Sequence, residues 1–297
     1  MATRSIELMG MRLSLFGDHR RVGLEMSSRL PLRRQETGAG PQSPVPSPST
    51  RSDPEVEAIG WYHTIDLGDG VVTPGFYDHR PILHHYALPE RLDGLRVLDI
   101  AAFDGFWSYE FERRGAAEVV ALDIERAREL DLAPHVRAGM TETELDRPFG
   151  AGFALAHARK RSKVRHVHCN VYDVSPEKLG LFDLVHCGDL LLHLRDPALA
   201  LARIRSVTRG EALISEAIFP DLDRHDSPLV VYDGGVSENI WWRFGAKSLT
   251  GMIRDAGFGT VEERARFRYG PRGAPASMWH SVIRAANPIQ VNDHARV

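Results

Sequence analysis

The sequence predicts an α/β fold in which helices flank a mostly parallel sheet and an antiparallel strand pair closes one edge. Three observations lead to this prediction. Strand-like apolar runs alternate with helix-like runs from residue 96 onward. The first four strand runs are short and apolar, which is typical of strands buried on both faces of a parallel sheet. The last two strand runs follow each other without a helix between them, which indicates an antiparallel edge.

The alternation can be written out element by element. The expected strands span residues 96–102, 118–124, 164–170, 182–187, 212–219, 260–267 and 278–285. The expected helices span residues 107–114, 149–160, 198–208 and 246–256.

The chain before this core divides into two parts. Residues 1–55 are expected to form an N-terminal arm and flexible linker, because 37–54 are rich in Gly, Pro and Ser. An arm of this kind offers contacts for a homodimer. Residues 56–95 are expected to form a segment near the substrate, with a strand at 60–67, a turn at 68–70 and a short helix at 80–88. The main domain then spans residues 96–290.

Composition narrows the class of protein. The 297 residues are 43% hydrophobic and carry a net charge of -3, so no global charge favours binding to polyanions. Cys169 and Cys187 lie in strand-like runs, which predicts free thiols in a reducing cytoplasm. No apolar run reaches about 18 residues, so no membrane partner is expected.

A nucleoside-type cofactor site is predicted where the first two strands of this domain end. Asp99 closes an apolar strand, and we expect it to meet a positively charged amino group. Gly105 follows in the turn, where its small size allows close backbone approach to a ligand. Asp123 ends the next strand, 24 residues after Asp99, and can accept both hydroxyls of a ribose. A cofactor with an ammonium, a sulfonium and a ribose fits this pair of acids better than a dinucleotide does, because a Gly-x-Gly-x-x-Gly turn is absent.

Several segments together resemble one enzyme group. They are Trp61-Tyr62-His63, Val71-Val72-Thr73-Pro74-Gly75, Val97-Leu98-Asp99 with Asp104-Gly105-Phe106-Trp107, Glu112-Arg113-Arg114-Gly115-Ala116, and Phe182-Asp183-Leu184-Val185 with Leu192-His193-Leu194-Arg195-Asp196-Pro197. From about residue 60 onward the chain resembles class I methyltransferases similar to the tRNA wobble-uridine carboxymethyltransferase, a group that includes natural-product methyltransferases. The resemblance implies a Rossmann-like sheet and S-adenosyl-L-methionine (SAM) as cofactor.

The resemblance also implies a set of contacts. In such loops glycine is common at the positions of Ala101, Phe103 and Gly105, and only Gly105 remains here. Phe103 is expected either to pack under the loop or to narrow the cofactor pocket. The cofactor-binding residues expected are Asp99, Ala101, Phe103, Gly105, Asp123, Ile124, Asn170, Val171, Tyr172 and Gly188.

The cofactor is expected to be plain SAM. The carboxymethyl branch of the group uses a carboxylated SAM, and the resemblance implies lysines before the first strand and a Tyr before the motif His. This chain has no lysine before Lys160, and Leu192 precedes His193. Both departures favour simple methyl transfer.

Two histidines are candidates for the catalytic group. His193 follows the fourth strand, and its ordinary pKa suits a general base, although it can equally pack at a helix start. His63 lies in the N-terminal segment beside Tyr62, and either direct contact with the ligands or a structural role is open.

The expected substrate contacts are Tyr62, Asp189, Trp241 and Trp242. The adjacent tryptophans favour a flat aromatic acceptor, and the alternative is that they pack in the core.

Other charged and histidine-rich runs do not change this prediction. His79, His84 and His85 lack a spacing that would place them on one helix face, so no metal is expected. The basic run at 157–166 has no interleaved aromatic residues and is typical of a solvated helix end, so nucleic acid is not the expected partner.

The sequence therefore predicts a SAM-dependent enzyme that methylates an oxygen or nitrogen of a small aromatic or polycyclic intermediate in antibiotic or other secondary metabolism. Two alternatives remain: an RNA methyltransferase of the wobble-uridine type, and an inactive binding module that retains the fold.

Overall fold

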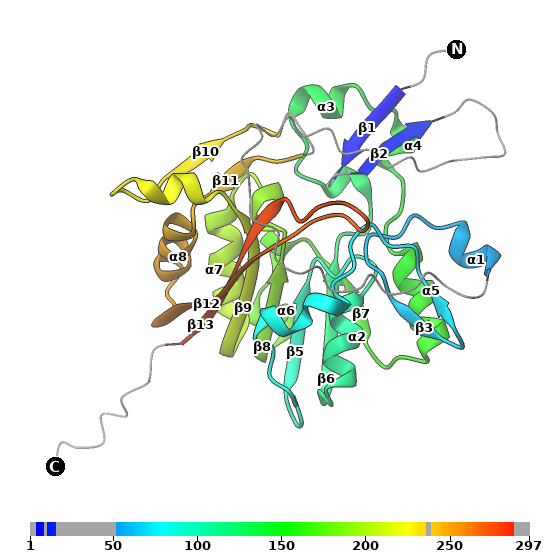
Figure 1. The fold of residues 1–297 in the computed structure, drawn as a ribbon, viewed down its shortest axis with the longest axis horizontal. Coiled ribbons are helices and arrows are strands. Elements are labelled where there is room, and N and C mark those ends of the chain that lie inside the picture. The colour runs from blue at the N-terminus through cyan, green and yellow to red at the C-terminus, as the bar shows by residue number, and fades with distance from the viewer. Residues whose placement is uncertain (1–3, 9–10, 16–51, 236–238, 288–297) are drawn as a thin grey trace.

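The computed structural model describes residues 4–8, 11–15, 52–235 and 239–287 (Figure 1). A nine-stranded sheet forms its centre, in the order β10-β11-β9-β8-β5-β6-β7, with β13 paired to β9 and β12 to β13. The strands are β5 (Arg96–Ile100), β6 (Glu118–Asp123), β7 (Arg165–His168), β8 (Phe182–Gly188), β9 (Thr208–Ile218), β10 (Val230–Tyr232), β11 (Trp242–Phe244), β12 (Thr260–Tyr269) and β13 (Met278–Ala286). The pairs from β7 through β9 are parallel and the β12–β13 pair is antiparallel, which confirms the predicted sheet.

Helices lie on both faces of the sheet. The longer ones are α2 (Phe106–Arg113), α5 (Ala151–Lys160), α7 (Pro197–Val207) and α8 (Ala246–Asp255), all close to their predicted positions. The α7 helix shows why the prediction works. Asp196 caps its first turn by accepting from the Leu199 N–H at 2.9 Å, Pro197 opens it, and Leu201 and Ile204 are fully buried.

The sheet separates two apolar cores. Val97 and Leu98 are adjacent in β5 and fully buried, but they pack into different cores because side chains alternate along a strand. Leu98 faces the core that contains α7 and α8. Val97 and Asp99 share the other face, which α2 covers.

The short elements were mostly not predicted. They are α1 (Pro54–Glu57), α3 (Pro134–Ala138), α4 (Glu142–Leu145), α6 (Pro176–Leu179), β3 (Asp66–Gly68), β4 (Val71–Val72), and the 3-10 turns η1 (Arg80–Tyr86), η2 (Ala127–Glu129), η3 (Val171–Asp173), η4 (Leu191–His193) and η5 (Pro220–Arg224). The helix expected at 80–88 is the 3-10 turn η1. The strand expected at 60–67 is confined to β3.

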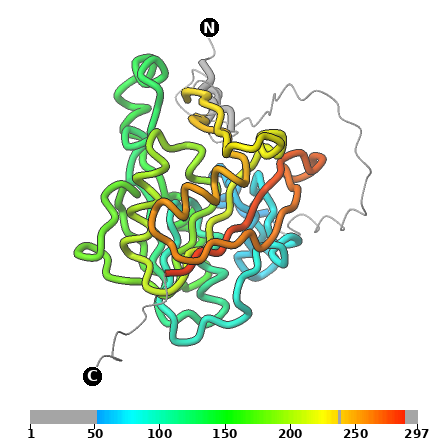
Figure 2. The backbone as a smooth tube through the Cα atoms, turned by 90° about the vertical axis from the view of Figure 1, so that its left-hand side faces the viewer, coloured from blue at the N-terminus to red at the C-terminus, as the bar shows by residue number. Residues whose placement is uncertain are grey.

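Residues before β3 instead run along residues 75–77. The Tyr77 N–H donates to the Tyr62 carbonyl at 2.8 Å, and the Thr64 N–H donates to the Tyr77 carbonyl at 2.8 Å. Gly75 allows this close approach, because a Cβ there would lie 2.0 Å from the His63 carbonyl carbon. Further along the chain, η1 lies beside the hairpin formed by β12 and β13, since the Tyr86 and Phe267 rings are 5.2 Å apart (Figure 2).

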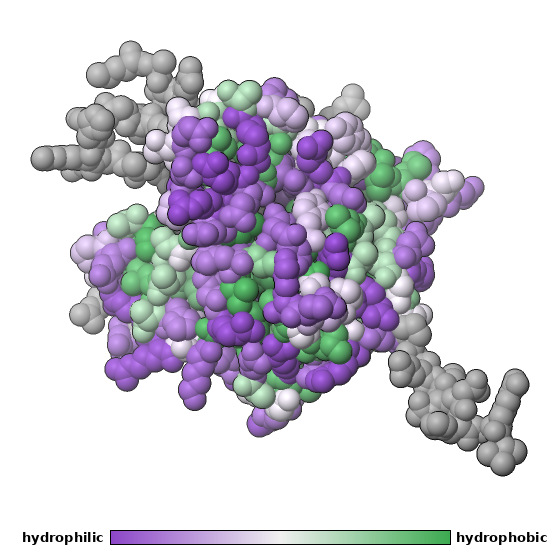
Figure 3. Space-filling view, turned by 180° about the vertical axis from the view of Figure 1, so that it is seen from behind, coloured by the Kyte–Doolittle hydropathy of each residue, from purple (hydrophilic) through white to green (hydrophobic). Residues whose placement is uncertain are grey.

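At the N-terminus, β1 (Arg4–Leu8) and β2 (Met11–Leu15) form an antiparallel hairpin. The linker expected up to residue 55 lies largely outside the described residues, and the expected dimer contact stays a prediction. The surface in Figure 3 is mainly hydrophilic, with separate apolar areas between charged side chains.

Candidate active site

Two adjoining cavities open at the carboxyl ends of the parallel strands, the edge of an α/β sheet where ligands bind. The first cavity spans about 610 Å³ and the second about 450 Å³, each including space open to solvent. Ile100, Ala101 and Phe103 line both. The first is also lined by Leu122, Asp123, Ile124, Glu129, Leu130, Asp131, Cys169, Asn170, Val171, Tyr172, Leu190, His193, Leu194 and Asn239. The second is also lined by Tyr62, His63, His79, Trp107, His186, Gly188 and Asp189.

In the loop after β5, two residues other than glycine adopt a backbone conformation that usually favours glycine. Ala101 has φ 58° and Phe103 has φ 52°, both in the left-handed region. This conformation costs a residue with a Cβ about 1 to 2 kcal/mol. The two side chains stand where glycine is common in the resembling loops, so the loop shape is retained although the sequence pattern is not.

Asp123 fastens that loop to the end of β6. Its Oδ2 accepts from the Phe103 N–H at 2.7 Å, and its Oδ1 accepts from the Ile124 N–H at 2.7 Å. Burial raises the pKa of Asp123 to about 6, although the two backbone hydrogen bonds oppose the rise. Each carboxylate oxygen retains a free lone pair, so the group can still accept two hydroxyls.

The turn after β7 closes the far side of the first cavity. Asn170 caps η3 by accepting from the Tyr172 N–H at 3.1 Å, and its Nδ2 donates to the Glu129 carbonyl. The Tyr172 hydroxyl donates to Asp131 at 2.5 Å. These bonds fix Asn170, Val171 and Tyr172 against the loop that carries Asp131.

Asp99 and Gly105 line neither cavity. Asp99 points to the α2 face of the sheet, where its carboxylate accepts from Ser108 Oγ at 2.5 Å and from His186 Nδ1 at 2.8 Å. The expected contact of Asp99 with an amino group stays a prediction. Gly105 precedes α2 with φ 89°, and a Cβ there would lie 2.6 Å from the Tyr109 ring, so it serves helix packing.

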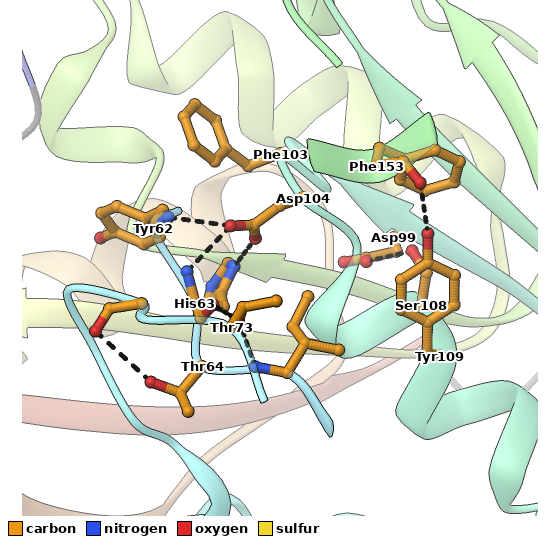
Figure 4. A network of polar contacts seen from close by, with 12 residues as sticks. Tyr62, His63, Thr64, Thr73, Asp99, Phe103, Asp104, Ser108, Tyr109 and Phe153 are labelled. Atoms are coloured by element: carbon orange, nitrogen blue, oxygen red, sulfur yellow. Dashed lines mark hydrogen bonds and ion pairs between the residues drawn. The ribbon is translucent and has the colours of Figure 1, made fainter. Parts of the chain in front are cut away.

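The buried carboxylate of Asp104 holds Tyr62 and His63 at the wall of the second cavity (Figure 4). Asp104 Oδ2 accepts from the N–H groups of Tyr62 at 2.8 Å and His63 at 2.9 Å. Asp104 Oδ1 accepts from His63 Nδ1. Because a carboxylate can only accept, Nδ1 carries the proton of a neutral His63 ring, and Nε2 keeps its lone pair.

Asp189 forms a second His–carboxylate pair at the same cavity. It accepts from the Tyr269 hydroxyl at 2.8 Å and from His280 Nε2 at 2.9 Å. Burial raises the pKa of Asp189, but the charge of His280 and the hydrogen bonds from His280 and Tyr269 outweigh it and lower the pKa to about 2. Asp189 is therefore an ionised anchor at neutral pH.

Two further histidines line the second cavity with a nitrogen that has no partner among the described residues. His186 Nδ1 donates to Asp99, which leaves Nε2 unpaired. His79 is 2% exposed, and its Nδ1 is unpaired. Burial, followed by the charge of His63, lowers the pKa of His79 well below its usual range. Both rings belong to the cavity wall, and these two nitrogens are themselves buried.

His193 lies at the first cavity and not at the second. Its Nδ1 is 3.1 Å from the Asn239 carbonyl oxygen, and burial lowers its pKa. The side-chain oxygen of Asn239 is buried in the same wall and has no hydrogen-bond partner. A catalytic role for His193 stays a prediction.

Trp241 and Trp242 line neither cavity. Trp241 is buried and donates from Nε1 to the Asp131 carbonyl at 2.6 Å, with Arg195 over its ring at 5.0 Å. Trp242 donates to the Arg195 carbonyl at 3.3 Å. Both indole N–H groups thus have partners within the fold, and the expected substrate contact stays a prediction.

The structure adds residues that the sequence analysis missed. Asp104 was quoted only as part of a motif, although an acid inside a ligand-binding turn was a usable signal. His186 is a polar residue in the otherwise apolar β8, which was a second signal. His79 was considered only as a metal ligand. Within the described ranges, no group of three or more His, Cys, Asp or Glu side chains is arranged to hold a metal.

Comparisons with known proteins identify the family and support the fold. The family model for a methyltransferase domain matches residues 77–263. The N-terminal domain of EvdMO1, solved in the presence of SAH and D-fucose, is 19% identical, with a TM-score of 0.53 over 79% of this chain and 94% of that chain. The same domain with SAH bound gives 19% identity and a TM-score of 0.52 over 79% and 93%.

A weaker likeness involves the Burkholderia thailandensis 1,6-didemethyltoxoflavin-N1-methyltransferase. It is 22% identical, with a TM-score of 0.43 over 66% of this chain and 72% of that chain. The comparison with curated proteins gave no match. No helix in the described part of the chain is long and apolar enough to cross a membrane.

Proposed function

This chain belongs to the methyltransferase-domain family, whose methyl donor is S-adenosyl-L-methionine, and on that premise we propose that it methylates a small molecule at oxygen or nitrogen. The observation that carries the proposal is the pair of adjoining cavities, one suited to bind a nucleoside and the other supplied with an oriented histidine. The bound cofactor supplies a methyl group on a cationic sulfur, and the acceptor must be aligned with it.

The first cavity fits the adenosine part of this cofactor. Adenosine offers hydrogen-bond donors from two ribose hydroxyls and one amino group. The wall offers the free lone pairs of Asp123 as acceptors for the ribose hydroxyls. Leu130 and Val171 supply apolar surface for a flat base. We assign Asp123, Ile124, Asn170, Val171 and Tyr172 to cofactor binding on these grounds.

The second cavity contains the better candidate for a general base. His63 lines it, and Asp104 fixes the ring with Nδ1 protonated and Nε2 able to accept a proton. This arrangement of a carboxylate behind a histidine is the one that activates nucleophiles in other enzymes. We therefore place His63 in the catalytic role and Asp104 behind it as a positioning residue. His193, on the wall of the first cavity, is assigned to cofactor binding.

The same pair favours a hydroxyl as the acceptor. An alcohol or phenol gains nucleophilicity when its proton is removed, whereas a neutral amine attacks with its own lone pair and can lose a proton afterwards. Tyr62 and Trp107 supply aromatic surface in the second cavity, which supports an aromatic acceptor in place of the Trp241 and Trp242 wall.

The proposal is tested first by calorimetry with SAM and then by transfer of a labelled methyl group. The acceptor panel contains phenols, aromatic amines and D-fucose, each matched by an analogue whose hydroxyl or amine is already methylated. We expect micromolar SAM binding and label on a hydroxyl-bearing acceptor but not on its methylated analogue. Absence of binding at millimolar SAM would exclude the enzyme. Label on amines alone would remove the assignment to oxygen.

A further inference from the structure

We propose that the Phe103 ring forms a cation-binding wall at the junction of the two cavities, so that the site prefers the sulfonium form of the cofactor to the neutral product. The inference rests on the proposed function, because it takes SAM as the ligand. It names Phe103 as a determinant of how tightly the charged donor and the demethylated S-adenosylhomocysteine (SAH) are held relative to each other.

The position of the ring carries the inference. Phe103 is one of three residues that line both cavities, with Ile100 and Ala101. In SAM the sulfonium joins the adenosine to the amino-acid end and also holds the methyl group. A ligand whose adenosine occupies the first cavity and whose methyl group faces the second therefore has its positive charge at the residues shared by both. Of these three, only Phe103 has a side chain that attracts a cation.

The chemistry of the ring fits that place. An aromatic face carries negative partial charge and attracts cations, including sulfur and nitrogen cations of ligands. The Tyr62 ring lies across from Phe103, with centroids 5.4 Å apart and planes inclined by 64°. The edge of one ring thus meets the face of the other, which fixes the orientation of Phe103. Phe149 contacts the ring on another side, at 6.2 Å.

Packing alone does not account for a phenyl group here. Phe103 is half-buried and belongs to none of the apolar core clusters of the described residues. Its backbone has φ 52°, a conformation that glycine adopts without strain. The Phe103 N–H still donates to Asp123, a bond that glycine would also make. The side chain therefore adds a steric cost without filling the core, which indicates a contact with a ligand.

The test compares the dissociation constants of SAM and SAH by calorimetry in the wild type and three variants. Phe103→Leu retains bulk but removes the aromatic face, and we expect it to weaken SAM about fivefold while SAH changes less than about twofold. Phe103→Tyr retains the face and should preserve the ratio. Phe103→Gly removes the ring and relieves the backbone, so it should fold at least as well as the wild type and lose the same preference.

Phe149→Leu is the matched control, because Phe149 contacts Phe103 but lines neither cavity. It should leave the ratio of the two constants unchanged. Equal weakening of SAM and SAH in Phe103→Leu would show that the ring provides shape only and would overturn the inference. If the wild type binds neither ligand, the proposed function itself fails, which is a separate outcome.

Discussion

The two cavities differ in how their walls are built. The first is mainly apolar, and its acidic groups are Asp123, Glu129 and Asp131. The second contains His63, His79, His186 and Asp189, and the buried carboxylates of Asp104 and Asp99 hold His63 and His186 in fixed orientations. The contrast supports the proposal that binding and chemistry are assigned to different ends of the same strand edge. In that proposal one wall binds the nucleoside, and the other holds His63, whose Nε2 keeps its lone pair.

The polar wall has an energetic cost. A buried polar atom without a partner destabilises a fold by about 1 to 3 kcal/mol. His79 Nδ1 and His186 Nε2 are such atoms among the described residues.

The largest effect is expected at the second cavity, where a substitution should remove activity without removing cofactor binding. His63→Ala should lower the rate of methyl transfer at least about a hundredfold while SAM affinity changes less than about twofold, because it removes the general base and leaves the first cavity intact. Single-turnover kinetics with labelled SAM measures the rate. Added imidazole should restore part of the activity, which a purely structural role would not allow.

Two controls accompany this variant. His84→Ala changes an exposed histidine outside both cavities and should have wild-type activity. His193→Ala should lower the rate less than about tenfold, since His193 lies at the first cavity. A larger loss in His193→Ala than in His63→Ala would reverse the assignment of the base.

The next effect concerns the first cavity. Asp123→Ala should raise the dissociation constant of SAM about tenfold or more, because it removes the acceptor of the ribose hydroxyls and the bond that fastens the Phe103 loop. Calorimetry measures the constant. Glu125→Ala, at an exposed acid two residues away, should bind SAM as the wild type does. Wild-type affinity in Asp123→Ala would contradict the ribose assignment.

A smaller effect follows from the pKa of Asp123, which burial raises to about 6. The ionised carboxylate accepts hydroxyls better than the neutral acid, so SAM affinity should be complete above this pKa and decline as pH falls through it. Between about pH 7.5 and about pH 5 we expect a loss of up to about tenfold. Asp123→Asn should remove most of this dependence, and an unchanged pH profile in that variant would assign the titration to another group.

The sequence predicted the sheet well because periodicity and capping are local properties. The parallel strands and the α7 cap depend on residues close together in the chain. It did not reveal the hydrogen bonds of Asp99, because they depend on strand register: Asp99 pairs with His186 across β5 and β8, 87 residues apart. Nothing in the run around Asp99 reveals that partner.

The sequence around the tryptophan pair was uninformative for a related reason. A polar loop before Trp241 indicates exposure, but the indole N–H donates to the carbonyl of Asp131, 110 residues earlier. In contrast, Asp123 and Asn170 line the first cavity, because the end of a parallel strand lies at the ligand edge. Their role in cofactor binding stays a prediction.

The partners of Asp189 also determine the order in which the two cavities can form. Tyr269 and His280 come from the last hairpin, 80 and 91 residues after Asp189, whereas the first cavity is formed by residues 100–194 and Asn239. During synthesis from the N-terminus, most of the nucleoside wall leaves the ribosome before the residues that anchor Asp189. A nascent chain stopped before β13 would lack the His280 bond, so the reactive half of the site is completed last.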